Sequence, residues 1–330
     1  PSAVIDPPPD EEPGPEPEPE PFFWFAVGDS GKVRLSVDNG LNFAAVDIGG
    51  YGPANVFAVA SNGLGVVITG GEGGVARRSS DNGVTWAAVD VGFGTENVQA
   101  IAVGLLNTWV AVSGHGRISR STDGGATWAL LPNSLGLIDP LITLTTNRDG
   151  VWLAGDGFGT IIRSIDNGVT WGEVNASFSG QPVTTLASLG SGVWVAGGAN
   201  DMVRRSTDNG ATWVSVSASG DFYLGGVANG DTVFLVGWNG VVLRSLDAGL
   251  TWNSRDALVG TTWMLCAAAS PAGRFLLGGQ GGIMALTPDN GDGWTTASAG
   301  FAPDQINAIA FGSGVLTPGG SDMNIESLAL

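Results

Sequence analysis

Short runs of apolar residues alternate with polar turns along most of this chain, and residues 98–131 show the pattern most clearly. Within this stretch, β-branched and other apolar residues concentrate at residues 98–103, 108–112, 117–121 and 127–131. Glycine, asparagine and aspartate separate the runs, and no run has a helical period of useful length. The pattern predicts four consecutive short strands that form one antiparallel sheet.

This unit repeats along the chain with a short motif, Ser-x-Asp-x-Gly-x-Thr-Trp, between its third and fourth strands. Five copies are complete and two are looser, and the aspartates of all seven are Asp38, Asp81, Asp123, Asp166, Asp208, Asp247 and Asp289. Each is followed two positions later by glycine and five positions later by an aromatic residue, namely Phe43, Trp86, Trp128, Trp171, Trp213, Trp252 and Trp294. A period of 39–43 residues with four strands per repeat is typical of a β-propeller.

The ends of the repeat region predict how the ring closes. The first copy has only strands two to four, and residues 306–311 supply the missing first strand. Pairing these segments gives an all-β, seven-bladed propeller of four-stranded antiparallel blades. An eight-bladed ring with two incomplete blades is the alternative, because residues 312–320 resemble residues 190–198, which cover a second strand.

Composition divides the chain into two parts. Residues 1–21 carry seven acids, no base and many prolines, which predicts a semi-rigid acidic spacer, either a solvated terminus or a tether. Residues 22–330 form the predicted propeller. The net charge of −18 argues against nucleic acid and anionic lipid as partners.

Few residues are suited to redox, metal or membrane roles. The single cysteine, Cys266, lies in an apolar run and excludes an intramolecular disulfide, and no apolar run is long enough for a membrane span. We expect no metal and no cofactor. Because the chain begins at Pro1, we expect a processed or trimmed form.

The repeated motif resembles the Asp box, or bacterial neuraminidase repeat. That repeat occurs in sialidases, sortilin-like receptors, xyloglucan-active glycosidases and photosystem II stability/assembly factor-like proteins. From about residue 22 to residue 311, the chain is most similar to the last group, with seven repeats near 42 residues and a strand-three pattern Arg-Ser-x-Asp-x-Gly. The resemblance implies the propeller fold, but it leaves function open because the box occurs in enzymes and non-enzymes.

The motif itself predicts a structural turn. Its carboxylate can accept hydrogen bonds from the turn, its glycine permits positive φ, and its tryptophan can pack on the neighbouring blade. The motif turns should share a face with the turns between strands one and two. Known Asp-box enzymes act on the opposite face, which holds the connections between blades and the turns between strands two and three.

The blade connections carry a second periodic signal, an apolar residue about twelve positions after the motif aspartate. With nearby aromatics, these residues either seal the ring or form an apolar crown around the channel mouth. The candidate crown consists of Tyr51, Phe93, Leu135, Phe178, Phe222, Trp263 and Phe301.

Two further sets of polar residues recur. The turns between strands two and three present Asp29, Glu72, His115, Asp156, Asp201, Trp238 and Gln280, which are solvated tips or, for the four carboxylates, a weak glycosidase signal. An arginine precedes the motif serine in five blades: Arg78, Arg120, Arg163, Arg205 and Arg244. Each arginine either bonds to a neighbouring blade or, as the assembly-factor resemblance implies, contacts a partner.

Sialidase residues are not assembled in the sequence. No arginine precedes the first motif in the region of Phe22–Phe25, and the chain has only two tyrosines. The links between blades are short, which is unusual for an active site. The sequence therefore predicts a non-enzymatic module that binds a protein or a glycan, for instance in a multiprotein assembly or a surface or virion appendage. A sialidase-like glycoside hydrolase is the alternative.

Overall fold

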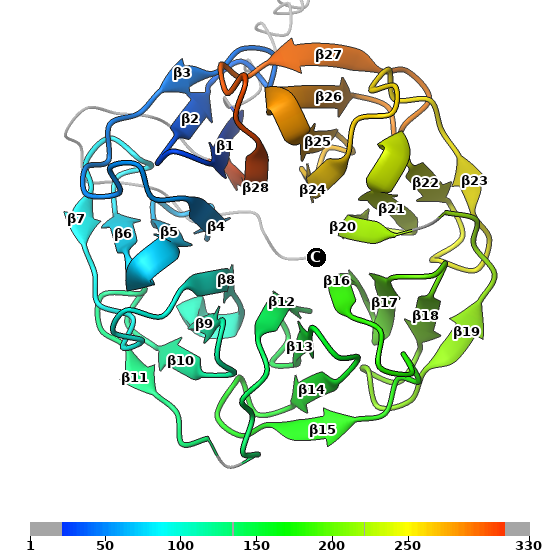
Figure 1. Cartoon of the computed structure of the whole chain (residues 1–330), viewed down its shortest axis with the longest axis horizontal. Helices are drawn as coiled ribbons and strands as arrows, with labels where there is room; N and C mark the ends of the chain where they lie inside the picture. Colours follow the sequence, from blue (N-terminus) through cyan, green and yellow to red (C-terminus); the bar gives the residue numbers. More distant parts are fainter. Residues whose placement is uncertain (1–21, 134, 221, 314–330) are drawn as a thin grey trace, which may run out of the picture.

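The computed structural model describes residues 22–133, 135–220 and 222–313, which form seven four-stranded antiparallel sheets around a central channel (Figure 1). In each blade the first strand lines the channel and the fourth lies at the outer edge. This confirms the prediction of a seven-bladed propeller.

The strands of blades 1 to 4, from the channel outward, have the following bounds. Blade 1 contains β28 (Ile306–Ser313), β1 (Phe22–Gly28), β2 (Val33–Ser36) and β3 (Ala44–Ala45). Blade 2 contains β4 (Val56–Ser61), β5 (Val67–Gly71), β6 (Ala76–Ser79) and β7 (Ala87–Ala88). Blade 3 contains β8 (Val98–Val103), β9 (Trp109–Ser113), β10 (Ile118–Ser121) and β11 (Ala129–Leu130). Blade 4 contains β12 (Leu141–Thr146), β13 (Trp152–Asp156), β14 (Ile161–Ser164) and β15 (Gly172–Val174).

Blades 5 to 7 repeat the arrangement. Blade 5 contains β16 (Val183–Gly190), β17 (Val193–Gly198), β18 (Val203–Ser206) and β19 (Val214–Val216). Blade 6 contains β20 (Tyr223–Asn229), β21 (Thr232–Gly237), β22 (Val242–Ser245) and β23 (Asn253–Ser254). Blade 7 contains β24 (Met264–Ala269), β25 (Phe275–Gly279), β26 (Ile283–Thr287) and β27 (Thr295–Ser298). Four single 3₁₀ turns complete the described structure: η1 (Glu72–Gly74), η2 (Leu105–Asn107), η3 (Trp238–Gly240) and η4 (Gln280–Gly282).

The four strands predicted within residues 98–131 are present, and β8 has the predicted bounds. The outermost strand, β11, is shorter than predicted, because Thr127 and Trp128 precede it and Leu131 follows it. All seven outer strands have only two to four residues. Such short edges present few unpaired backbone groups to another sheet.

The ring closes between the first and last described strands. β28 pairs antiparallel with β1, and Phe25 lies opposite Ala310. The eight-blade alternative is wrong, because β1 pairs with β28. In that alternative, residues 312–320, which resemble residues 190–198, would have formed the second strand beside β28. In the comparison of these two segments, Pro318 corresponds to Ala196, which pairs with a neighbouring strand on each side. Proline is unsuited to such a position in the sequence of a central strand. Residues 314–330 and the predicted spacer at residues 1–21 lie outside the described residues.

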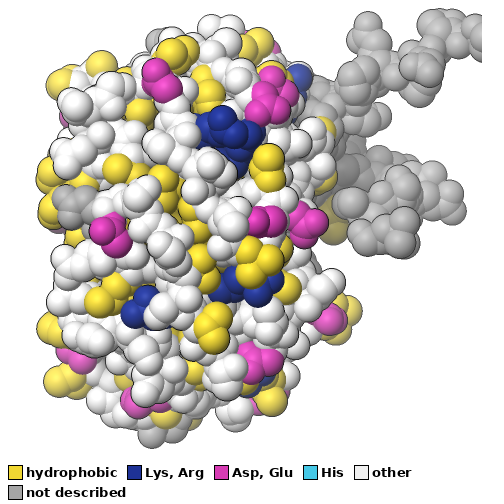
Figure 2. All heavy atoms as spheres, turned by 90° about the vertical axis from the view of Figure 1, so that its right-hand side faces the viewer, with side chains coloured by type: hydrophobic (Ala, Val, Ile, Leu, Met, Phe, Trp, Pro, Cys, Tyr) yellow, Lys and Arg dark blue, Asp and Glu magenta, His cyan; other side chains and the backbone are white. Residues whose placement is uncertain are grey.

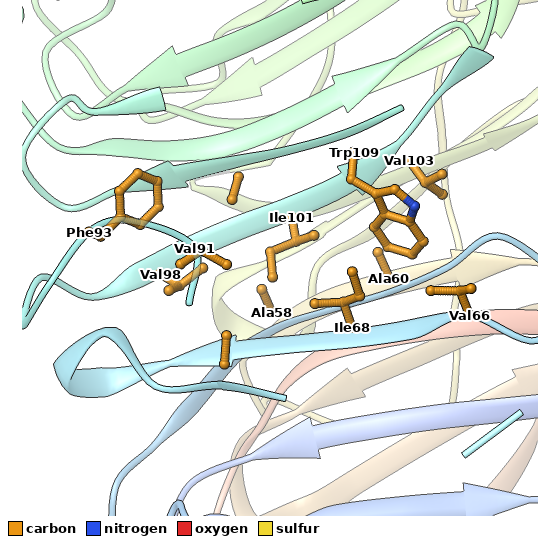
Figure 3. Close-up of a cluster of buried hydrophobic side chains, with 12 residues drawn as sticks. Ala58, Ala60, Val66, Ile68, Val91, Phe93, Val98, Ile101, Val103 and Trp109 are labelled. Carbon is orange, nitrogen blue, oxygen red and sulfur yellow. The ribbon is translucent and has the colours of Figure 1, made fainter. Parts of the chain in front are cut away.

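The core is divided into seven apolar clusters, one at each contact between neighbouring blades. Figure 3 shows the cluster between blades 2 and 3, where Ile68 and Trp109 lie near the repeat-motif end and Phe93 packs near Val98 at the other end. Since every cluster draws on two blades, no blade buries its apolar side chains without its neighbours.

The two faces of the ring are distinct. The turns between strands one and two and those between strands three and four share one face, which we call the repeat-turn face. There, for example, Asn82 N–H donates to the carbonyl of Gly65 at 2.9 Å. The other face, which we call the loop face, carries the turns between strands two and three and the blade connections. There Glu72 N–H donates to the carbonyl of Asn55 at 2.9 Å. This division agrees with the sequence prediction.

Four of the seven candidate crown residues are buried between blades. Phe93, Phe178 and Phe301 are at most 2% exposed and Tyr51 is 5% exposed. The Tyr51 hydroxyl lies 3.0 Å from the Thr69 hydroxyl and donates to the carbonyl of Val75. The prediction of an exposed crown is therefore wrong at these four positions, because the rings are inserted into the apolar clusters rather than turned toward the channel mouth.

The buried crown residues should act on stability. We expect Phe93→Ala and Phe301→Ala each to reduce the free energy of unfolding by about 3–5 kcal/mol, because each leaves a large cavity between blades. Denaturant unfolding measures this, with Ile138→Ala, 80% exposed in another connection, as the control that changes little. Wild-type stability in either phenylalanine variant would contradict the sealing role.

Candidate binding site

The seven repeat motifs form nearly identical turns that are held by a recurring set of hydrogen bonds. In the turn of blade 2, Ser79 Oγ donates to Asp81 Oδ1 at 2.7 Å and accepts from Gly83 N–H at 2.8 Å. Thr85 also donates to Asp81, through its N–H at 2.8 Å and its hydroxyl at 2.5 Å. The same serine or threonine bond to aspartate occurs in every blade at 2.7–2.8 Å. The motif aspartates are thus used inside their own turns.

These bonds stabilise the charged form of the carboxylates. Hydrogen bonds from the Thr212 hydroxyl and then its N–H lower the pKa of Asp208 to about 2. Hydrogen bonds from the Thr251 hydroxyl and, less strongly, from its N–H likewise lower the pKa of Asp247 to about 2. Burial acts in the opposite direction but has less effect than the hydroxyl bond. The carboxylates therefore stay ionised at neutral and mildly acidic pH.

In six of the seven turns, all but that of Gly40, the glycine allows close approach to the preceding blade, because an added Cβ would lie within 3.0 Å of it. Gly125 has φ +74°, and a Cβ there would lie 2.1 Å from Ile68 Cδ1 of blade 2. The motif tryptophans pack in the same direction, as Trp86 does edge-on against Phe25 of blade 1 at 6.2 Å between ring centroids. The turn therefore fixes its own hairpin and docks it on the neighbour.

The five candidate partner-contact arginines bond across blades. The Nε of Arg78, Arg120, Arg163 and Arg205 donates at 2.6–2.8 Å to the carbonyl just before the turn glycine of the next blade. Arg244 Nη1 makes the equivalent bond to Asn290 at 2.7 Å and also contacts Asp292 at 2.7 Å. This is the structural alternative named above. Leucine replaces arginine in blades 1 and 7, at Leu35 and Leu286.

A second set of arginines was not predicted. Arg34, Arg77 and Arg204 lie one position earlier in the third strand and reach the opposite way. They donate to carbonyls in the connection from the preceding blade, at Gly300, Gly49 and Ala176. The Arg-Arg pairs at 77–78 and 204–205 were the available signal, since neighbouring strand residues point to opposite faces of the sheet.

Three aromatic rings predicted separately come together on the loop face. Phe222 stacks on Trp238 with centroids 4.7 Å apart, and Trp238 stacks on Trp263 at 4.8 Å, with the planes within 16°. All three are partly exposed. The backbone N–H of Trp238 donates to the carbonyl of Phe222 at 3.0 Å, which holds η3 against the start of β20. We call Phe222, Trp238 and Trp263 the aromatic stack.

The aromatic stack lies beside the channel. Leu224 and Leu265, each two residues after a stacked ring, line a central cavity of about 260 Å³. The lining residues include Gln99 and four threonines but no charged side chain. Cys266 also lines it and is 8% exposed, and burial raises the pKa of its thiol. The cavity lining is therefore uncharged, and Phe222 and Trp263 lie just outside it, directly before the channel strands β20 and β24.

The carboxylates of the loop face are bound within their own neighbourhoods. Asp29 accepts from Asn307 Nδ2 at 3.0 Å, Glu72 from Asn55 N–H at 3.2 Å, and Asp201 from Gly220 N–H at 2.8 Å. Asp156 is 3% exposed and accepts from the N–H groups of Phe158 and Thr160. Each carboxylate positions a loop.

A second hollow, of about 710 Å³, lies at the edge of blade 3. Arg117 and His115 both face Glu96 there, at 3.3 and 3.8 Å, and Leu130 and Ile138 form its apolar wall. Within residues 22–133, 135–220 and 222–313, no three His, Cys, Asp or Glu side chains are grouped to hold a metal ion. The same ranges contain no helix long and apolar enough to cross a membrane.

The fold and its repeated turns define a seven-bladed β-propeller of four-stranded blades. No family model matches the chain, and no curated protein matches it. Among solved structures it is similar to YCF48 bound to D1 peptide, with a TM-score of 0.66 and 19% identity over 79% of this chain and 88% of that one. YCF48 from Cyanidioschyzon merolae gives a TM-score of 0.59 and 15% identity over 73% and 84%.

About half of a glycoside hydrolase has a similar fold. The GH74 xyloglucanase from Xanthomonas campestris gives a TM-score of 0.68 and 17% identity, covering 89% of this chain and 53% of that one. At such identities the likenesses establish the fold, and they include both a peptide-bound protein and an enzyme.

The inter-blade arginines should contribute to stability. We expect Arg163→Leu to lower the free energy of unfolding by about 1.5–3 kcal/mol, because it removes a charged hydrogen bond to Asn209. Leucine is compatible with this strand position in blades 1 and 7. Arg117→Leu, whose side chain is 44% exposed, is the matched control and should cost less than about 1 kcal/mol in urea unfolding. Equal effects of the two variants would contradict the assignment.

The turn carboxylates should make stability depend on pH in acid. Asp208 has a folded pKa of about 2, below its unfolded value near 3.9, so its contribution is complete above about pH 4 and is lost as the pH falls through 2. Thr212→Val removes the main hydrogen bond, so stability should fall less steeply between about pH 4 and 2. Urea unfolding at a series of pH values compares the two proteins, and identical slopes would refute the role of this bond.

Proposed function

We propose that this propeller is a non-catalytic binding module that holds a protein partner on its loop face, at the aromatic stack. The observation that carries the proposal is the stack itself, in which three large rings remain partly exposed beside the channel mouth. Tryptophan and other large aromatic residues are enriched among the side chains that contribute most to protein binding. Elsewhere, on the side of the ring that carries β19 and β23, hydrophobic, acidic and basic side chains are interspersed (Figure 2).

The arrangement of the loop-face carboxylates supports a binding role over hydrolysis. A glycosidase needs two carboxyl groups free to act on opposite sides of one bond. Here Asp29, Glu72, Asp156 and Asp201 each accept bonds from their own or an adjoining loop. The enzymatic alternative of a sialidase-like hydrolase has no corresponding set of free groups among these four.

The solved complex of YCF48 with D1 peptide supports a protein ligand, because it shows that a propeller of this fold can hold a peptide. The acidic composition also favours one kind of protein partner over another. A net charge of −18 favours partners with basic surfaces and slows association with acidic ones. A glycan bound at the stack is the second possible ligand class, since sugars also pack on aromatic rings.

The aromatic stack should be required for binding but not for folding. We expect Trp238→Ala with Trp263→Ala to abolish capture of the partner that the wild-type chain retains from its native source, with little change in the thermal midpoint. Mass spectrometry identifies the partner, and titration of the purified partner then gives the loss in affinity.

Phe158→Ala is the matched control, because Phe158 is an aromatic on the same face, 58% exposed, in blade 4. It should leave binding unchanged, and an equal loss would contradict the placement at the stack. Stack-dependent binding of glycans without any protein would overturn the protein assignment. Turnover of a glycoside at enzymatic rates would overturn the non-catalytic one.

A further inference from the structure

The residues around the channel mouth on the loop face occupy two repeated positions in each blade. One is the residue just before the first strand, and the other is the first residue of the turn between strands two and three. In six blades the second donates its backbone N–H to the carbonyl of the first, as Gln280 does to Trp263 at 3.0 Å. We call these fourteen residues the inner rim. From blade 1 to blade 7 they are Gln305 and Asp29, Asn55 and Glu72, Asn97 and Gly114, Pro140 and Gly157, Pro182 and Ala199, Phe222 and Trp238, and Trp263 and Gln280.

The inner rim surrounds a single opening. The central cavity of about 260 Å³ is lined by residues from the first strands of all seven blades. In each blade this lining starts two or three residues after the inner rim, for example at Phe57, Leu224, Leu265 and Ala308. The strands β20, β24, β28 and β4 follow one another around the channel (Figure 1). The rim residues of blades 6, 7, 1 and 2 are therefore neighbours around one mouth.

The composition of the inner rim changes around this mouth. Blades 6 and 7 contribute the aromatic stack, whereas blades 4 and 5 contribute only proline, glycine and alanine. Asp29 of blade 1 and Glu72 of blade 2 are the only charged residues among the fourteen. Gln280 and Gln305, both partly exposed, come between the stack and Asp29. The mouth therefore has an aromatic side and an acidic side, joined by amide side chains.

Asp29 and Glu72 each keep one carboxylate oxygen available to a partner. Asp29 Oδ1 accepts from Asn307 Nδ2 at 3.0 Å and from Gln305 Nε2 at 3.5 Å. Glu72 Oε2 accepts from the N–H of Asn55 at 3.2 Å. No hydrogen bond or ion pair from the described part of the chain reaches the other oxygen of either carboxylate. Glu72 is exposed and Asp29 partly exposed, so both can accept from a charged donor above the mouth.

The other charged groups on this side of the loop face balance one another. The turns between strands two and three of blades 1 to 3, the connections into these blades and the third-strand arginines that reach those connections contain four acids and four bases, besides His115. They are Lys32, Arg34, Asp47, Arg77, Asp90, Glu96, Arg117 and Asp304. Lys32 pairs with Asp304 at 2.9 Å, and Arg117 with Glu96 at 3.3 Å. The excess of negative charge on this side therefore comes from the two acids of the inner rim.

We propose that the inner rim holds an extended segment of the protein partner in one direction, with an apolar side chain packed on the aromatic stack and a lysine or arginine over Asp29 and Glu72. This inference rests on the proposed function and adds to it the chemistry of a second contact. Charge complementarity at the acidic side selects the basic residue and fixes the register of the segment. The amides of Gln280 and Gln305 lie between the two contacts, where they can bond to the backbone of the segment.

Peptide selection tests the proposal. A display library of random short peptides is selected on three forms of the full chain: the wild type, Trp238→Ala with Trp263→Ala, and Asp29→Asn with Glu72→Gln. The last pair removes both charges but keeps an acceptor oxygen at each position. We expect the wild type to enrich peptides with an apolar residue and, at a constant separation, a lysine or arginine. The charge variant should enrich apolar peptides without the basic residue, and the stack variant neither kind.

Titration of one enriched peptide measures the contribution of the acidic side. Asp29→Asn with Glu72→Gln should weaken its binding about threefold to tenfold, the range for contacts between exposed charges, and the difference should disappear in high salt. Asp201→Asn is the matched control. Asp201 is an exposed carboxylate of the same face, but it lies outside the inner rim, at a turn position where the other six blades have glycine. This substitution should leave the affinity unchanged.

The outcomes separate this inference from the proposed function. Peptides that require the stack but carry no basic residue, or that bind the charge variant as tightly as the wild type, would overturn the inference and leave the binding role of the stack intact. Enrichment that does not depend on the stack, or no enrichment on the wild type, would overturn both. Self-association of the wild type that the charge variant abolishes, measured by sedimentation, would assign the inner rim to a second copy instead.

Discussion

The fold depends on the set of hydrogen bonds that joins the serine, threonine, aspartate and glycine residues of each repeat turn. These bonds hold the carbonyl before the glycine in a fixed position. In five blades, an arginine of the preceding blade donates a hydrogen bond to that carbonyl. The close approach of Gly125 to Ile68 shows how little space separates turn and neighbour. One local turn therefore sets both the hairpin and the angle between blades, and repeating it seven times gives the ring.

The sequence predicted the features that follow from periodicity. Blade number, strand order, the division into two faces and the inward packing of the motif tryptophans all depend on residues that recur every 39–43 positions. The arginine pairs at 77–78 and 204–205 were visible but were not interpreted. Strand alternation would have sent the two side chains of each pair in opposite directions.

The depth of the crown residues could not be predicted, because it depends on what fills each seam between blades. Twelve positions after the motif aspartate, Phe178 enters its seam and is buried. In the connection to blade 6, Gly220 stands at that position and Tyr223 fills the space instead, which leaves Phe222 on the surface. In the connection to blade 7, Val259 fills the seam and Trp263 is likewise left over. The aromatic stack thus forms at two neighbouring connections, each of which has one aromatic residue, Phe222 or Trp263, that is not needed to fill the space between blades.

The pairing of β1 with β28 has a consequence for how the molecule is made. Phe25 and Ala310 are neighbours in one sheet although nearly the whole propeller separates them along the chain. On the ribosome, blades 2 to 7 can assemble in order as they emerge, but β1 must wait for β28, which is synthesised after all of these blades. Until then Phe23, Trp24 and Phe25, all fully buried in the finished ring, have no inner strand to pair with. Among the strands of the propeller, β1 therefore waits longest for its inner neighbour, and its apolar residues stay incompletely covered until the ring closes.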